Sequence, residues 1–81
     1  MYSNTHPTVG YGSKVTVRRE FTIKPQTYHI QTYTDLSCNV ISVEHPIAKA
    51  LMHHTVGDKV LIDDPKMYYF VEILEVVNEN N

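Results

Sequence analysis

The sequence contains no tryptophan and only one cysteine, Cys38, in its 81 residues. A single cysteine cannot close an internal disulfide and cannot supply the several thiolates of a cysteine-based zinc site. No histidine or basic residue stands next to Cys38, so we expect a small buried apolar side chain there rather than a nucleophile. The sequence therefore excludes a disulfide-stabilised scaffold and fits a reducing compartment.

Long apolar runs are also missing. No stretch approaches the ~20 apolar residues that a membrane-spanning helix requires. The first seven residues, MYSNTHP, lack the basic and apolar regions of a secretion signal. We therefore expect a cytoplasmic protein that does not associate with a membrane.

Positive charge is scarce. Seven lysines and arginines stand against nine aspartates and glutamates, for a formal net charge of −2, and the only adjacent basic pair is Arg18-Arg19. Binding to a nucleic-acid backbone needs a concentrated cationic face, so we expect no direct sequence-specific binding to nucleic acid. A chain this short buries only about three fifths of the surface exposed by its unfolded form, which argues against a deep enclosed active site.

Alternating apolar and polar residues indicate three strands in the first half of the chain. They are residues 13–20, 26–33 and 38–43. The first two should pair as a hairpin, because Lys24-Pro25-Gln26 interrupts the alternation between them.

The pattern changes to helical spacing at Pro46, and proline suits the first position of a helix. Ile47, Ala50 and Leu51 then fall on one face of a short helix. Apolar residues at this spacing are usually buried, so we expect Ile47 and Leu51 to belong to the core.

Two further strands complete the expected fold, one through Val60 and Ile62 and one over residues 67–77. The phase of the last strand slips at Leu74-Glu75, which predicts a β-bulge and a curved sheet. With one helix and short connections, the order indicates an α+β domain whose sheet is mainly antiparallel. We expect this single domain to cover residues 9–78, flanked by flexible tails at residues 1–8 and 79–81.

One continuous motif occupies residues 41–52, ISVEHPIAKALM, and is followed at residues 56–58 by VGD. It resembles the C-terminal domain of the bacterial transcript cleavage factors GreA and GreB, in which a strand ending in Ser-Val leads through a polar pair into Pro-Ile-(Gly/Ala)-(Lys/Arg)-Ala-Leu. Residues 9–15, VGYGSKV, are similar to the family's Val-x-x-Gly-Ser-x-Val. Pro65 and residues 72–76 match its late turn proline and its terminal strand. The resemblance covers nearly the whole chain.

The resemblance implies an FKBP-like fold, a strongly curved and mainly antiparallel sheet of about five strands around one short helix. It also implies a partner, RNA polymerase. In the family this domain docks at the outer rim of the polymerase secondary channel, through the loop before the helix and the start of the helix. The residues at these positions, which are the candidate partner-binding residues, are Glu44, His45, Pro46, Ile47 and Lys49.

In the same family a separate N-terminal coiled coil enters the channel, and acidic residues at its tip help to hold a catalytic magnesium ion. An arm of about 40 Å needs roughly 27 residues in each of two helices. Eight residues precede the expected domain, and none of them is acidic. We therefore expect a transcription regulator that docks on the polymerase without cleaving transcripts, is not itself an enzyme and needs no cofactor.

Two other groups of residues could be taken for a reactive site. His53 and His54 are adjacent and lack the i, i+4 spacing of a helical zinc site, so exposed histidines at a helix end are the better interpretation and we expect no metal. The pair Asp63-Asp64 precedes Pro-Lys, which is typical of a solvated turn rather than of a magnesium site or an acid/base pair.

Two alternative functions stay open. Tyr28, Tyr33, Tyr68 and Tyr69 lie on or beside predicted strands, and several of them exposed together would suit an interaction module with a partner other than polymerase. Of these, we expect Tyr69 in the core and Tyr68 on the outer face. The implied fold also suggests a peptidyl-prolyl isomerase, which needs an aromatic-lined pocket, yet the chain has no tryptophan and two phenylalanines.

Overall fold

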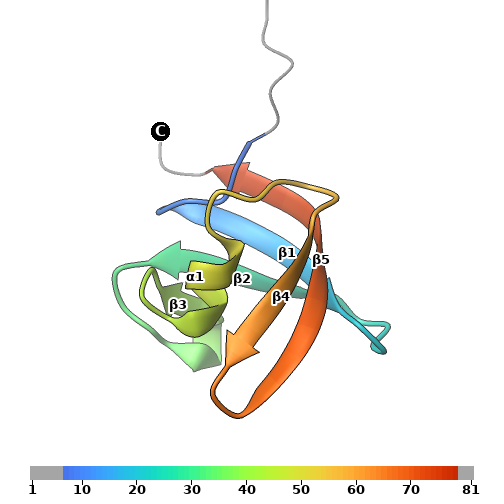
Figure 1. Ribbon diagram of the computed structural model, residues 1–81. Helices are drawn as coiled ribbons and strands as arrows, with labels where there is room; N and C mark the ends of the chain where they lie inside the picture. The colour runs from blue at the N-terminus through green and yellow to red at the C-terminus, as the bar shows by residue number, and fades with distance from the viewer. Residues whose placement is uncertain (1–6, 79–81) are drawn as a thin grey trace, which may run out of the picture.

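The computed structural model describes residues 7–78, where five strands form one curved sheet and an α-helix lies against its inner side (Figure 1). In chain order the elements are β1 (Ser13–Arg19), β2 (Gln26–Gln31), the 3₁₀ helix η1 (Leu36–Cys38), β3 (Val40–Ser42), α1 (Pro46–Leu51), β4 (Lys59–Asp64) and β5 (Met67–Asn78). The predicted α+β class is confirmed. Most of the tail expected at residues 1–8, and all of the tail expected at residues 79–81, lie outside the described residues.

The strands lie in the order β3-β2-β1-β5-β4. Strands β1 and β2 form the predicted antiparallel hairpin, and β1 with β5 and β4 with β5 are also antiparallel. Strands β2 and β3 are parallel, with His29 opposite Val40 and Gln31 opposite Ser42. The sheet is thus mainly antiparallel, as expected, with one parallel pair at its β3 edge.

A β-bulge interrupts the pairing of β1 with β5. Thr16 lies opposite Glu75, whereas the next residue, Val17, lies opposite Ile73, so Leu74 is an additional residue on β5. Such a bulge increases the local twist and bends the strand. The bulge predicted from the phase slip is therefore confirmed, and it helps β5 to curve around the helix (Figure 1).

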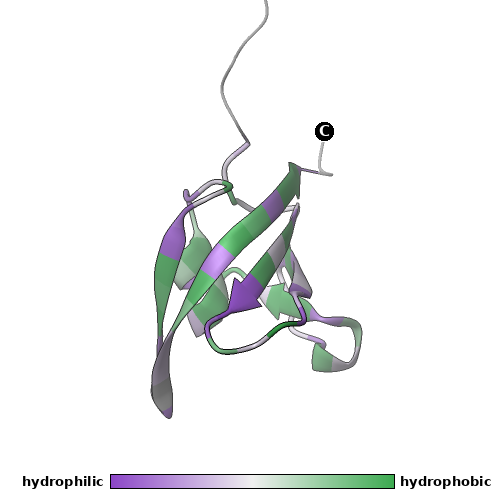
Figure 2. Ribbon diagram, turned by 90° about the vertical axis from the view of Figure 1, so that its right-hand side faces the viewer, coloured by the Kyte–Doolittle hydropathy of each residue, from purple (hydrophilic) through white to green (hydrophobic). Residues whose placement is uncertain are grey.

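The core lies between the concave side of the sheet and α1. Apolar and polar residues alternate along the long strand that leads to the C-terminus, so only one side of it contributes to the core (Figure 2). On the helix, Leu51 and Ala48 are completely buried, whereas Ile47 and Ala50 are partly buried and pack against the core. Complete burial of a leucine contributes about 1.5–3 kcal/mol. The expectation for Leu51 is confirmed, and Ile47 lies at the margin of the core.

The third strand begins later than expected, and the expectation that Cys38 is buried is wrong. Cys38 is exposed at the end of η1, and β3 starts at Val40. The side chain of Asp35 accepts hydrogen bonds from the Ser37 N–H (3.1 Å) and the Ser37 hydroxyl (2.6 Å), which favours a helical turn. Asn39 then adopts a left-handed conformation with φ of 57°, which ends the turn.

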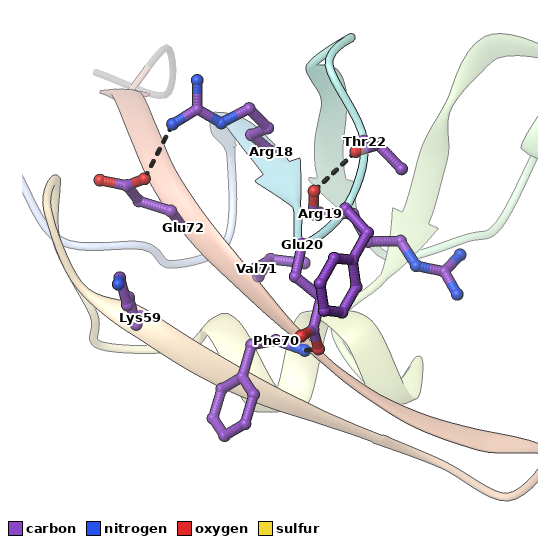
Figure 3. A pocket seen from close by; sticks show the side chains of 9 residues that line it. Arg18, Arg19, Glu20, Thr22, Lys59, Phe70, Val71 and Glu72 are labelled. Carbon is purple, nitrogen blue, oxygen red and sulfur yellow. Dashed lines mark hydrogen bonds and ion pairs between the residues drawn. The ribbon is translucent and has the colours of Figure 1, made fainter.

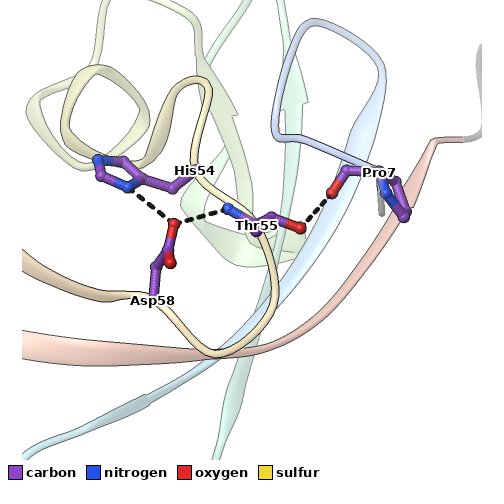
Figure 4. Close-up of polar contacts among 4 residues, drawn as sticks. All are labelled: Pro7, His54, Thr55 and Asp58. Carbon is purple, nitrogen blue, oxygen red and sulfur yellow. Dashed lines mark hydrogen bonds and ion pairs between the residues drawn. The ribbon is translucent and has the colours of Figure 1, made fainter. Parts of the chain in front are cut away.

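The first described residues are attached to the loop after α1. Val9 is buried, and its N–H donates to the carbonyl oxygen of His54 at 2.9 Å. Thr8 and Thr55 form an isolated antiparallel bridge. The Thr55 hydroxyl also donates to the carbonyl oxygen of Pro7 at 2.8 Å (Figure 4). These contacts hold residues 7–9 beside the C-terminal end of α1.

Candidate functional site

The five candidate residues lie on the segment that leads from β3 into the first turn of α1, named here the β3–α1 segment (residues 44–49). Ser42, at the end of β3, fixes its direction. The Ser42 hydroxyl accepts from the Glu44 N–H at 3.1 Å, and the Ser42 carbonyl oxygen accepts from the His45 N–H at 2.9 Å. The segment therefore leaves the sheet through a hydrogen-bonded turn.

His45 caps the N-terminus of α1. Its backbone is extended, and its Nδ1 atom accepts a hydrogen bond from the Ile47 N–H at 3.2 Å. Accepting at Nδ1 requires an imidazole without a proton on that nitrogen. The His45 carbonyl oxygen accepts from the Lys49 N–H at 2.9 Å, and Pro46 occupies the first turn, where a missing N–H costs nothing. This capping role was not predicted, although the position directly before Pro46 is the signal that indicates it.

The side chains of the segment divide by exposure. Glu44 and Lys49 are exposed, and His45 and Pro46 are half-buried. Ile47 is also half-buried and packs against the core. The segment thus presents two opposite charges on either side of a rigid proline, with an apolar residue beside them. Such a surface suits a protein partner, because a preorganised backbone loses little entropy on binding.

A groove on the concave side of the sheet adjoins this segment and was not predicted. It has a volume of about 360 Å³, and Ile47 contributes to its wall. The residues that line it, here called the concave groove, are Val17, Arg19, Thr22, Lys24, Pro25, Gln26, Tyr28, Ile47, Ile62, Tyr69 and Val71. This lining contains two cations and no carboxylate, and the charge of nearby Asp64 acts on Tyr69 in its wall.

Arg19 and two tyrosines determine the character of the concave groove. The guanidinium carbon of Arg19 lies 4.1 Å from the centre of the Tyr69 ring, a cation–π contact. Burial raises the pKa of Tyr28 and the pKa of Tyr69, and the nearby Arg19 charge opposes the rise at both. Both phenols therefore stay protonated at neutral pH, and the Tyr28 hydroxyl donates to Gln26 Oε1 at 2.6 Å.

On the outer face, a second groove of about 430 Å³ lies at the base of the loop between β1 and β2 (Figure 3). Arg18 and Glu72 form an ion pair across β1 and β5, with 3.1 Å between Nη2 and Oε1. Glu20 accepts a hydrogen bond from the Phe70 N–H at 2.6 Å. An exposed ion pair contributes little to stability. Phe21, from that loop, also lines the outer groove, which therefore combines apolar surface with charges of both signs.

The other groups considered from the sequence do not form a reactive site. Within residues 7–78, no three His, Cys, Asp or Glu side chains come close enough together to hold a metal ion. His54 Nδ1 lies 3.1 Å from Asp58 Oδ2, which also accepts the Thr55 N–H at 3.0 Å (Figure 4). The Thr55 bond, and then the His54 bond, lower the pKa of Asp58. Asp63 and Asp64 are the last two residues of β4 rather than turn residues, and the turn itself is Pro65-Lys66; the Asp64 side chain accepts from the Lys66 N–H at 2.9 Å.

The four tyrosines near the strands do not form one face. Tyr28 and Tyr69 line the concave groove. Tyr68 is 73% exposed and Tyr33 is 58% exposed, and neither contributes to that groove. The predicted exposure of Tyr68 is confirmed, whereas Tyr69 is only partly buried and packs against the core.

Comparison with known proteins matches most of the chain to one family. The family model described as "Transcription elongation factor, GreA/GreB, C-term" matches residues 4–78. The chain is 44% identical over 70 residues to transcription elongation factor GreA of Streptococcus thermophilus, covering 84% of this chain and 44% of that protein. It is 37% identical over 68 residues to GreA of Francisella philomiragia, covering 82% and 42%. The chain thus spans less than half the length of these curated relatives.

Solved structures of similar fold agree. The crystal structure of Thermus aquaticus Gfh1 has a TM-score of 0.76 and 25% identity, covering 90% of this chain and 50% of that one. The elongation factor GreA/GreB from Nitrosomonas europaea has a TM-score of 0.68 and 26% identity, covering 85% and 59%. The strongly curved sheet with one short helix is therefore the fold of this group. No helix of the described residues is long and apolar enough to cross a membrane.

Proposed function

The chain belongs to the GreA/GreB family of transcription elongation factors through its match to their C-terminal domain, and from this premise we propose that it binds RNA polymerase at the rim of the secondary channel. The β3–α1 segment makes the contact. Such a partner places the protein in the cytoplasm, and the contact requires neither a cofactor nor direct recognition of a nucleic-acid sequence.

The observation that supports this proposal is the geometry of the segment within the family's fold. His45 caps the helix, Ser42 fixes the preceding turn, and Pro46 restricts the backbone between them. Glu44 and Lys49 are left exposed for ion pairs with a partner. Charge-assisted contacts around a rigid proline favour binding to one complementary partner surface over nonspecific binding.

A binding measurement with a matched control tests the proposal. The probe is purified core RNA polymerase of Streptococcus thermophilus, with that organism's GreA as positive control. The double variant Pro46→Ala/Lys49→Glu should weaken binding at least about tenfold, because central interface residues commonly contribute this much. The turn after β4 offers the same two residue types in an exposed position, so Pro65→Ala/Lys66→Glu is the control and should bind as the unmodified chain does. Absence of binding by the unmodified chain at micromolar concentration would refute the proposal.

We also propose that the 81-residue chain occupies this site without cleaving transcripts, so that it competes with full-length factors. Added to stalled elongation complexes, it should leave the nascent RNA intact. In excess over S. thermophilus GreA, it should reduce GreA-stimulated cleavage, because both need the same rim site. Cleavage by the chain alone, or no competition despite binding, would contradict this part of the proposal.

A further inference from the structure

The loop between β1 and β2 carries the two most exposed large apolar side chains among the described residues. We call this loop, residues 20–25, the hairpin tip. Phe21 is 98% exposed and Ile23 is 92% exposed, whereas the next most exposed large apolar side chain, Tyr68, is 73% exposed. Figure 1 shows the tip extending away from the body of the sheet. A single exposed apolar residue needs no explanation, but two of them, two positions apart at a projecting tip, indicate a contact surface.

Hydrogen bonds hold the hairpin tip in one conformation. The Glu20 N–H donates to the Phe70 carbonyl oxygen at 2.9 Å, and the Glu20 carboxylate accepts from the Phe70 N–H at 2.6 Å. The Thr22 hydroxyl donates to the carbonyl oxygen of Arg19 at 2.6 Å (Figure 3). These bonds keep Phe21 in the left-handed region, with φ of 65°, which is unfavourable for an aromatic residue. Phe21 thus stands between two hydrogen-bonded residues, Glu20 and Thr22.

The concave groove connects the hairpin tip to the β3–α1 segment. Thr22, Lys24 and Pro25 of the tip line one part of it, and Ile47 of α1 lines another. A partner that contacts Pro46 and Lys49 therefore finds this groove beside its first contact. Phe21 lies across the hairpin tip from it and lines the outer groove. Lys24 is an exposed cation in this lining, and it favours a negatively charged group on the partner.

We propose that the hairpin tip and the concave groove form a second contact region for the same polymerase surface, and this inference rests on the proposed function. The partner segment carries an acidic side chain next to apolar ones. The acidic group lies near Lys24, the apolar groups enter the groove, and the segment continues over the hairpin tip to cover Ile23 and Phe21, which lines the outer groove. A continuous contact from Lys49 to Ile23 explains why a small domain keeps two large apolar residues in water.

The test uses two variants of the tip and one matched control. Phe21→Asn/Ile23→Ser removes the apolar surface, and asparagine tolerates the left-handed backbone at position 21. Lys24→Glu reverses the charge and leaves the apolar residues in place. Leu36→Ser is the control, because Leu36 is also exposed, at 64%, and lies in η1 beyond the opposite end of β2.

Each variant is measured for affinity to purified S. thermophilus core RNA polymerase, with its thermal unfolding recorded to verify the fold. Both tip variants should weaken binding at least about tenfold, as expected for apolar and charged anchors of an interface. Leu36→Ser should bind as the unmodified chain does. Affinity unchanged in Phe21→Asn/Ile23→Ser would refute the second contact and leave the proposed function intact if Pro46→Ala/Lys49→Glu still binds weakly.

Two further measurements identify other occupants. Light scattering after size exclusion detects a second copy of the chain, and sedimentation with anionic phospholipid vesicles detects a lipid surface. Self-association or vesicle binding that disappears in Phe21→Asn/Ile23→Ser would overturn the inference in favour of that occupant. If the unmodified chain does not bind polymerase at all, the proposed function and this inference both fail, whereas weaker binding in the tip variants as well as in Pro46→Ala/Lys49→Glu supports both.

Discussion

Replacing His45 with alanine should destabilise the domain through a single hydrogen bond. Among residues 7–78, the His45 ring is the side chain that accepts from the Ile47 N–H, one of the backbone donors at the start of α1 that have no partner within the helix. Losing an N-cap side chain costs about 1 kcal/mol, within a range of about 0.5–2 kcal/mol. In a domain of this size, 1 kcal/mol corresponds to a decrease in Tm of about 4–8 °C. The helix has only six residues, so it has little other structure with which to compensate.

Thermal unfolding followed by circular dichroism measures this effect, and two variants separate the cap from other causes. His45→Asn supplies a strong capping side chain and should keep most of the stability. Glu44→Ala changes the exposed neighbouring residue and should shift Tm by less than about 2 °C. A Tm of His45→Ala equal to that of the unmodified chain, or an equal loss in His45→Asn, would refute the assignment of His45 as the cap.

Three further outcomes are expected. Leu51→Ala should lower the free energy of unfolding by about 2–5 kcal/mol in urea titrations, because Leu51 is completely buried. The control is Leu61→Ala, which should cost less than about 1 kcal/mol because Leu61 is 45% exposed. Ser13→Ala should cost about 1–3 kcal/mol in the same titrations, because the buried Ser13 hydroxyl accepts from the Gly10 N–H at 2.9 Å and donates to Asn78; no change would contradict that role. The folded pKa of Asp58 lies below its ordinary value of 3.8, so its stabilising effect is complete above that value and is lost as the pH falls through the folded pKa. Asp58→Asn should therefore make the free energy of unfolding depend less on pH between about pH 5 and pH 2. If an NMR titration gave Asp58 a pKa at or above its ordinary value, Asp58 would not be the source of this pH dependence.

Local sequence patterns were sufficient to predict most of the fold. The strands, the helix starting at Pro46 and the bulge near Leu74 follow from the spacing of apolar residues, because burial on one side of a strand or helix repeats with its period. The same patterns failed at residues 38–39. There, the Asp35 cap begins a 3₁₀ helix and the left-handed Asn39 ends it, so Cys38 lies in this helix and is exposed to solvent. Polar capping of this kind leaves no periodic signal.

The candidate site was predicted less completely. The resemblance gave the β3–α1 segment, but not the concave groove beside it, because that groove depends on contacts between distant parts of the chain. Arg19 and Tyr69 are separated by fifty positions (69 − 19) and meet only through the pairing of β1 with β5. The parallel pairing of β2 with β3 was equally hidden, since the short connection through η1 gives no indication of strand direction.

The way the chain enters and leaves the domain has a practical consequence for every assay named above. Ser13 lies opposite Asn78 in the sheet, and Val9 is bonded to His54 just beyond the end of α1, so both ends of the described chain lie on one side of the molecule (Figure 1). The β3–α1 segment lies at the other end of α1. A linker that replaces the residues before Pro7 or after Asn78 would therefore leave the domain on the side remote from Pro46 and keep the proposed contacts accessible to a molecule as large as polymerase.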